Sequence, residues 1–156
     1  MKSCMRGVFI CVSVLMLAAG LCACGSSEET IPAGTLSKKQ FLTRATAICA
    51  QGAKEAQKFD DAAWQKYQPD HITEDEAVLN KISLALLPAR EKELRRLRAL
   101  GLPKGSEKLV DEMLTAAEEG FEEGREEPRL LREGTKEFGL IRSYEMGVSY
   151  GLEGCW

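Results

Sequence analysis

Apolar residues recur every three to four positions over most of this chain, a spacing that predicts an all-α domain over residues 37–156. The first helix opens at Ser37, which forms a Ser-x-x-Gln capping box with Gln40, and Pro69 ends the helical pattern. We therefore expect a long amphipathic helix over residues 37–60. Its apolar stripe contains Phe41, Ala45, Ile48, Gly52, Ala56 and Phe59, and Trp64 and Tyr67 can prolong it.

A second helix follows, and the sequence Thr73-Glu74-Asp75-Glu76 marks its start. This segment is a capping box with Thr73 as the N-cap, and its carboxylates interact favourably with the helix dipole. We expect Pro88 to kink or split the helix and Gly101 to stop it. The predicted inner face contains Val78, Ile82, Leu86, Leu94 and Leu97.

Two more helices complete the pattern, one over residues 106–127 and one that begins near Thr135, after Pro128. Four amphipathic helices with short connections predict an up-down-up-down four-helix bundle in a single domain. The third apolar line contains Leu109, Met113, Ala116 or Ala117, Gly120 or Phe121, and Gly124. The fourth contains Phe138, Ile141, Glu145, Val148 and Leu152, and Gly151 or Gly154 supplies its C-cap.

The N-terminus has a different pattern, in which two positive charges precede an uncharged apolar run. This order, followed by small residues and a polar tract, is typical of a cleaved export signal. A transmembrane anchor is the alternative, but such an anchor needs about 20 apolar residues. The run from Val8 to Leu21 is shorter and is interrupted by Ser13 and Gly20, which favours the signal.

The end of the apolar run, Leu21-Cys22-Ala23-Cys24, resembles the lipobox of bacterial lipoproteins. The resemblance implies that residues 1–23 are removed and that Cys24 carries a diacylglycerol thioether. Residues 24–36, rich in Gly, Ser, Thr and Pro, then form a flexible tether. We therefore expect a lipid-anchored protein on the extracytoplasmic face of the cell membrane, with the domain at residues 37–156.

The net charge of the chain limits the classes of molecule that it is expected to bind. The chain has a formal net charge of −3, and removal of Lys2 and Arg6 with the signal makes the charge of the mature protein −5. An acidic, exported domain without a basic cluster argues against a nucleic-acid partner.

Processing also simplifies the cysteine inventory. Of the six cysteines, Cys24 is lipidated and only Cys49 and Cys155 remain in the domain. Two thiols in an oxidising compartment pair most simply as a disulfide. A zinc site is the alternative, but His71 is the only histidine, so a Cys/His ligand set is incomplete. The three that leave with the signal are Cys4, Cys11 and Cys22.

The sequence gives only weak signals for any other functional site. The acidic run at residues 118–127 suggests a cation site, but no Glu-x-x-His motif accompanies it, and neighbouring arginines favour a solvated face. His71 follows Asp70 without any nucleophile motif. Three aromatic residues could form a ligand platform, although a role at the edge of the core is favoured. We therefore predict no catalytic residue, cofactor or metal site. The aromatic residues are Trp64, Tyr67 and Trp156.

Two short motifs resemble those of small secreted helical proteins of high-GC Gram-positive bacteria. One is a cysteine in the first helix, in the pattern Phe41-Leu42…Cys49, and the other is the terminal Tyr150-Gly151-Leu152…Cys155. A segment Leu97…Leu100…Pro103 lies between them. The resemblance implies a helical fold and an extracytoplasmic compartment, and it implies no substrate.

These patterns predict a non-catalytic interaction or accessory module that binds another envelope protein. The alternative function is a carrier that binds a small molecule or an ion between its helices. The two differ in an observable way. A carrier needs a cavity with apolar walls and a few convergent polar groups. An interaction module needs a closed core and an exposed apolar patch.

Overall fold

The computed structural model describes residues 35–68 and 74–156, and these form helices and no strand. Thr73, which the sequence predicts as an N-cap, lies outside the described residues, as do the lipobox and His71. The all-α prediction is confirmed. The helices are α1 (Lys38–Tyr67), α2 (Glu76–Ala99), α3 (Glu107–Glu126), α4 (Leu130–Glu133) and α5 (Gly139–Tyr150).

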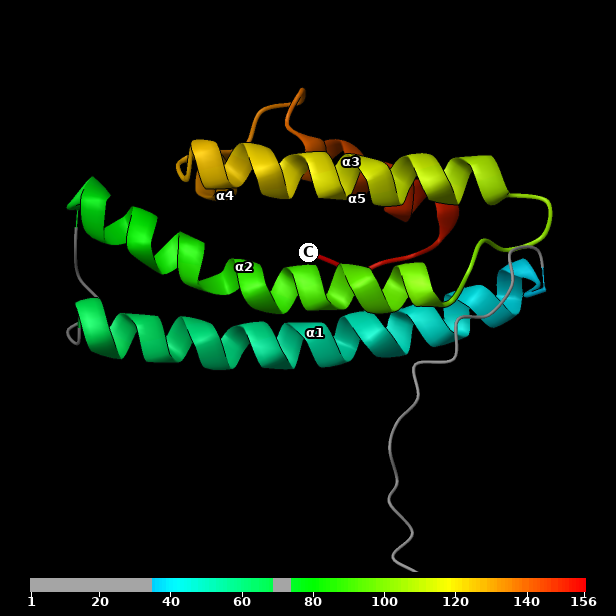
Figure 1. Ribbon diagram of the computed structural model, residues 1–156, viewed down its shortest axis with the longest axis horizontal. Helices are drawn as coiled ribbons and strands as arrows, with labels where there is room; N and C mark the ends of the chain where they lie inside the picture. The colour runs from blue at the N-terminus through cyan, green and yellow to red at the C-terminus, as the bar shows by residue number, and fades with distance from the viewer. Residues whose placement is uncertain (1–34, 69–73) are drawn as a thin grey trace, which may run out of the picture.

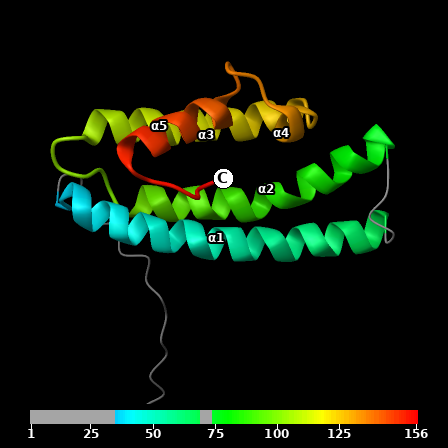
Figure 2. The same ribbon diagram turned by 180° about the vertical axis from the view of Figure 1, so that it is seen from behind.

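The helices form two pairs rather than one evenly packed group. Helix α1 packs along α2, α3 packs along α5, and α2 joins the pairs through its contact with α3. The C-terminal segment after α5 runs back between the two pairs (Figures 1 and 2). Gly151 directs it there, because it takes the left-handed conformation at the end of α5 and Leu152 N–H donates to the Gly147 carbonyl.

Helix α1 begins as predicted, with a complete capping box between Ser37 and Gln40. Its buried stripe differs from the predicted one at two positions. Cys49 is buried where Ile48 was expected, and Phe59 is 45% exposed. Small side chains on α1 let α2 approach α1 closely. The buried stripe of α1 therefore runs along these small residues. Its residues are Phe41, Ala45, Cys49, Gly52, Ala56 and Ala63.

Helix α2 begins at Glu76, and Asp75 is its N-cap in place of the predicted Thr73. The Asp75 carboxylate accepts hydrogen bonds from two backbone N–H groups of the first turn, which explains its choice as cap. Pro88 lies inside the helix, which continues through it and bends in its middle part (Figure 1). The buried face includes Ile82, Leu94 and Leu97 as predicted, and also Glu93.

Helix α3 has the predicted bounds within one residue, but Val110 is buried in place of Leu109, which is 39% exposed. Helix α5 begins later than predicted, and a one-turn helix, α4, precedes it. The buried face of α5 itself is also different, although Phe138 and Leu152, which flank the helix, are buried as predicted. Its buried residues are Gly139, Ser143, Gly147 and Tyr150, whereas Glu145 and Val148 point away from the core.

Small residues at every fourth position explain the packing of α5, because they allow two helix backbones to approach closely. A Cβ atom on Gly139 would lie 2.4 Å from the Ala116 carbonyl oxygen, and one on Gly120 would lie 2.3 Å from the Leu140 backbone nitrogen. The Ser143 hydroxyl donates a hydrogen bond to a backbone carbonyl of α3 at 2.8 Å. A count of apolar residues does not register glycine and serine, so it selects the wrong face.

Candidate functional site

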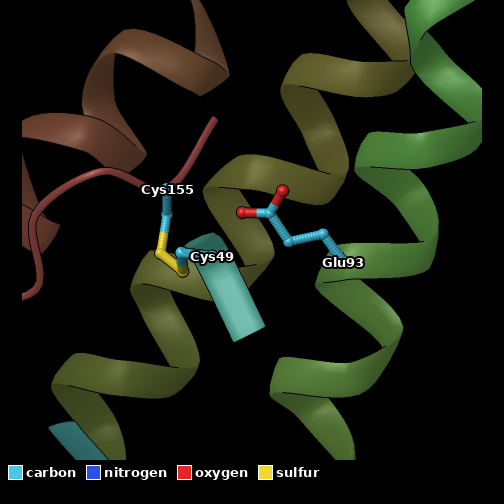
Figure 3. Close-up of side chains that lie close together, drawn as sticks. All are labelled: Cys49, Glu93 and Cys155. Atoms are coloured by element: carbon cyan, nitrogen blue, oxygen red, sulfur yellow. A yellow bond between two sulfur atoms is a disulfide. The ribbon is translucent and has the colours of Figure 1, made fainter. Parts of the chain in front are cut away.

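The predicted disulfide is present and buried. Cys49 of α1 is bonded to Cys155 of the C-terminal segment, with the two Cα atoms 4.8 Å apart (Figure 3). Both residues belong to the hydrophobic core. The bond therefore fixes the C-terminal segment between the two helix pairs.

Glu93 of α2 points toward this disulfide (Figure 3). It is 1% exposed, and one carboxylate oxygen forms an ion pair with Arg90 at 3.0 Å. The other oxygen, Oε1, has no hydrogen-bond partner among the described residues. Gly52 of α1 provides the space, because a Cβ atom there would lie 2.0 Å from the carboxylate. An ionisable side chain therefore lies in the core beside a disulfide.

The surroundings of Glu93 favour its neutral form. Burial raises the pKa of the Glu93 carboxyl, and the nearby Arg90 guanidinium and the Trp156 backbone N–H only partly oppose this. One carboxylate oxygen of Glu93 and the two sulfur atoms lie within 4.8 Å of one another, close enough for shared metal ligation. Disulfide sulfur atoms are not thiolates, and thiolates are the metal ligands that cysteine supplies. In its oxidised form the cluster is therefore a structural element.

Replacement of Glu93 by glutamine should stabilise the protein increasingly as the pH rises. The pKa of Glu93 is higher in the folded than in the unfolded protein, so the folded state binds this proton more tightly. The wild-type protein therefore loses stability as the pH rises from 4.5, the ordinary pKa, through the raised value. The Glu93→Gln protein does not lose stability in this way, because the glutamine side chain does not release a proton.

The measurement is the difference in unfolding midpoint between Glu93→Gln and wild type at several pH values from 4 to 8. The exposed Glu126→Gln is the matched control, and its difference from wild type should not follow the same trend. A Glu93→Gln difference that is constant with pH would contradict the assignment.

A cleft of about 320 Å³ lies beside Glu93 and the Cys49–Cys155 disulfide, between the helix pairs. Its walls are mostly apolar, and the ring of Trp156 meets Phe121 edge to face, with centroids 6.3 Å apart. Both tryptophans of the chain line it. The apolar lining residues are Trp64 of α1, Leu79, Ile82, Leu86 and Leu87 of α2, Phe121, Leu131, Leu140 and Trp156.

Four polar side chains complete the lining: Asp60, Ser83, Arg90 and Arg132. Arg90 is held by Glu93. Arg132 of α4 donates hydrogen bonds to Asn80 Oδ1 at 2.6 Å and to Ser83 Oγ at 3.4 Å, both neutral groups. No aspartate or glutamate in the segments that the structure describes forms an ion pair with Arg132, so its charge is not neutralised by the protein there.

A second groove, between α3 and α5, has a different character. It is larger, about 640 Å³, and more open, and its lining is charged, with Asp111, Glu112, Glu119 and Glu145 around Arg142. Arg142 pairs with Glu119. Ala116 and Met146 give this groove some apolar surface, but the groove is more open than the cleft and would enclose a ligand less, so the cleft beside the disulfide is the better candidate site.

The acidic run at residues 118–127 is largely neutralised by arginines, as the solvated-face interpretation predicts. Most of its glutamates are exposed, and Glu123 accepts a hydrogen bond from the Gly139 backbone at 2.8 Å. No ligand-like arrangement of these carboxylates is found among the described residues. The ion pairs are Arg98–Glu118, Arg142–Glu119, Arg125–Glu122 and Arg129–Glu127.

The structure brings together some of the predicted site residues and not others. Cys49 and Cys155 meet as predicted. Trp64 and Trp156 lie in the cleft wall rather than only at the edge of the core, whereas Tyr67 is not part of the lining. Cys24 lies outside the described residues.

Glu93 and Arg132 were not predicted from the sequence. For Glu93 a signal exists, because it lies four residues from both Ala89 and Leu97, which are buried on the same face. For Arg132 there is none, since its position depends on the one-turn helix α4.

Searches of protein-family models, curated protein sequences and solved structures return no match to this chain. Within the described segments, no helix combines the length and apolar character that a membrane crossing requires. The geometry of the cleft therefore carries the functional proposal.

Proposed function

We propose that this protein is a lipid-anchored, extracytoplasmic module whose cleft binds a small, mostly apolar ligand. The lipobox-like sequence supports anchoring through Cys24, with residues 24–36 as the tether to the domain. The role is non-catalytic, that of a carrier or receptor at the membrane surface.

The cleft is the observation that carries this proposal. Its volume of about 320 Å³ is near the lower end of the range for ligand sites, roughly 300–1,000 Å³. Its apolar walls surround a few polar groups, which is the property that distinguishes a carrier from an interaction module. The geometry therefore favours the function that the sequence ranked second.

The proposed architecture explains how such a cleft can exist. We propose a modified four-helix up-down bundle in which α2 contacts α3 and the C-terminal segment fills much of the remaining space between the two pairs. Trp156 then forms part of the cleft wall. The disulfide keeps the segment in place and so supports the site.

An interaction module is the second candidate, and the outer face of α5 favours it. Tyr144 is 50% exposed and Val148 is 41% exposed, and they lie four residues apart on the same face of the helix. This face would suit an envelope protein partner. We rank it second because the cleft combines apolar walls with a few polar groups, which is the property that a carrier requires.

Quenching of tryptophan fluorescence tests ligand binding directly, because both tryptophans line the cleft. Bromine quenches indole emission on contact, so ω-bromoundecanol, a neutral alkyl chain, is a suitable probe. We expect saturable quenching by this probe. Leu86→Phe, which fills part of the cleft, should weaken binding roughly tenfold, about 1.4 kcal/mol.

The matched control is Leu109→Phe, the same substitution at a partly exposed leucine outside the cleft. It should leave the affinity unchanged. Absence of saturable quenching, or equal effects of the two substitutions, would contradict the carrier and return the interaction module to first place.

A further inference from the structure

We infer that the ligand of the cleft is a single-chain amphiphile with a carboxylate headgroup, and that Arg132 binds this headgroup. The inference rests on the proposed function, since it names the chemical class of the ligand for the same site. It follows from the charges around the cleft and from the size of the cleft.

Arg132 is the lining cation whose charge the protein leaves available. Its two hydrogen bonds go to an amide oxygen and a hydroxyl oxygen, and they orient the guanidinium at the cleft. A guanidinium presents five N–H donors in a planar fork, so donors remain for a ligand. A carboxylate fits this fork with two parallel hydrogen bonds, which gives both affinity and orientation.

The other charged groups of the lining support this choice of headgroup position. Arg90 is paired with the buried Glu93, so its charge is already balanced. Asp60 comes from α1, whereas Arg132 comes from α4, so the lining carries opposite charges on different elements. An anionic headgroup is attracted to the α4 side and repelled from the α1 side. The charge distribution thus fixes the orientation of the ligand.

The apolar part of the site indicates a single hydrocarbon chain. Leucines of α2, α4 and α5 and the aromatic rings of Phe121 and Trp156 form one continuous lining next to Arg132. A volume of about 320 Å³ has room for one chain of moderate length and not for the two chains of a membrane phospholipid. The ligand is therefore a free monocarboxylate amphiphile rather than a bilayer lipid.

The experiment compares two probes that differ only in the headgroup, ω-bromoundecanoate and ω-bromoundecanol, by tryptophan quenching at pH 8. In the wild-type protein the carboxylate should bind roughly tenfold more tightly than the alcohol, as a charge-assisted hydrogen-bond pair allows. Arg132→Gln should remove this preference, because it should weaken binding of the carboxylate much more than binding of the alcohol.

Asp60→Asn is the second variant, and it is independent of Arg132. It should strengthen binding of the carboxylate modestly, by about twofold, and change binding of the alcohol less, because it removes a charge that repels only the carboxylate. Its fold does not depend on the Arg132 contacts, so the headgroup assignment remains testable even if Arg132→Gln fails to fold.

The outcomes separate the inference from the proposed function. Equal affinity of both probes in the wild type, each weakened by Leu86→Phe, would overturn the headgroup assignment and preserve the ligand cleft. A carboxylate preference that survives in Arg132→Gln would overturn the role of Arg132. Failure of both probes to bind would refute the inference and the proposed function together.

Discussion

Replacing both Cys49 and Cys155 by alanine is expected to lower the free energy of unfolding by about 4–5 kcal/mol. The bond joins residues 106 positions apart, so it closes most of the domain into one loop and removes much of the conformational entropy of the unfolded chain. Domains of this size have a total stability of about 5–15 kcal/mol. The variant should therefore be marginally stable at 37 °C.

Urea denaturation of the wild type and the double variant, followed by circular dichroism, measures this loss. The double substitution avoids a free thiol beside Glu93, and the Leu109→Phe protein serves as a control that keeps the disulfide. The variant should also bind ω-bromoundecanol more weakly at low urea, since Trp156 is the residue next to Cys155 and forms part of the cleft wall. A loss below about 1 kcal/mol would contradict the role of the bond.

Gly139→Ala is expected to destabilise the protein by about 2–3 kcal/mol, although alanine is the better helix former. Helix propensity alone predicts a gain of about 1 kcal/mol. The added Cβ atom would lie 2.4 Å from both the Ala116 carbonyl oxygen and the Gly120 backbone nitrogen. Because these are backbone atoms, α5 must move away from α3 as a whole, and the contacts between the two helices loosen.

Gly147→Ala is the matched control, on the same helix and the same stripe. There the nearest atom to the added Cβ is the Leu152 carbonyl oxygen at 3.1 Å, and the next is the Met113 sulfur atom at 3.5 Å. A small shift can accommodate this contact, so the change in stability should be within about 1 kcal/mol of zero. If Gly139→Ala proved as stable as wild type, the close approach of α3 and α5 would be wrong.

The sequence predicts those parts of the fold in which burial and apolar character coincide. Phe41, Ala45 and Met113 lie on predicted stripes and are buried, and the capping box at Ser37 starts α1 as expected. The pairing of the two cysteines followed from elimination, because few thiols remain after the expected processing. These features depend on local pattern or on simple counting.

The sequence pattern does not predict features that depend on tertiary packing. The face of α5 was predicted wrongly because Gly139 and Ser143 are buried for their small size rather than for hydrophobicity. Helix α4 is a single turn, too short to show a period. Glu93 is polar in sequence, yet the space above Gly52 buries it beside the disulfide.

The cleft could not be predicted for a related reason. Its lining comes from all five helices and the C-terminal segment, and only their arrangement brings Trp64, Trp156 and Arg132 to one site. Apolar stripes look alike in a closed core and in the wall of a cavity. The proposal of a carrier over an interaction module therefore rests on the three-dimensional arrangement.

A crystal structure of the protein with ω-bromoundecanoate, with the bromine located by anomalous scattering, would show directly whether the cleft binds this amphiphile. We expect a bromine peak in the cleft, among Leu86, Leu140 and Trp156, with the carboxylate at Arg132. A well-ordered complex with the bromine only in the charged groove between α3 and α5, or with the cleft empty at saturating ligand, would contradict it.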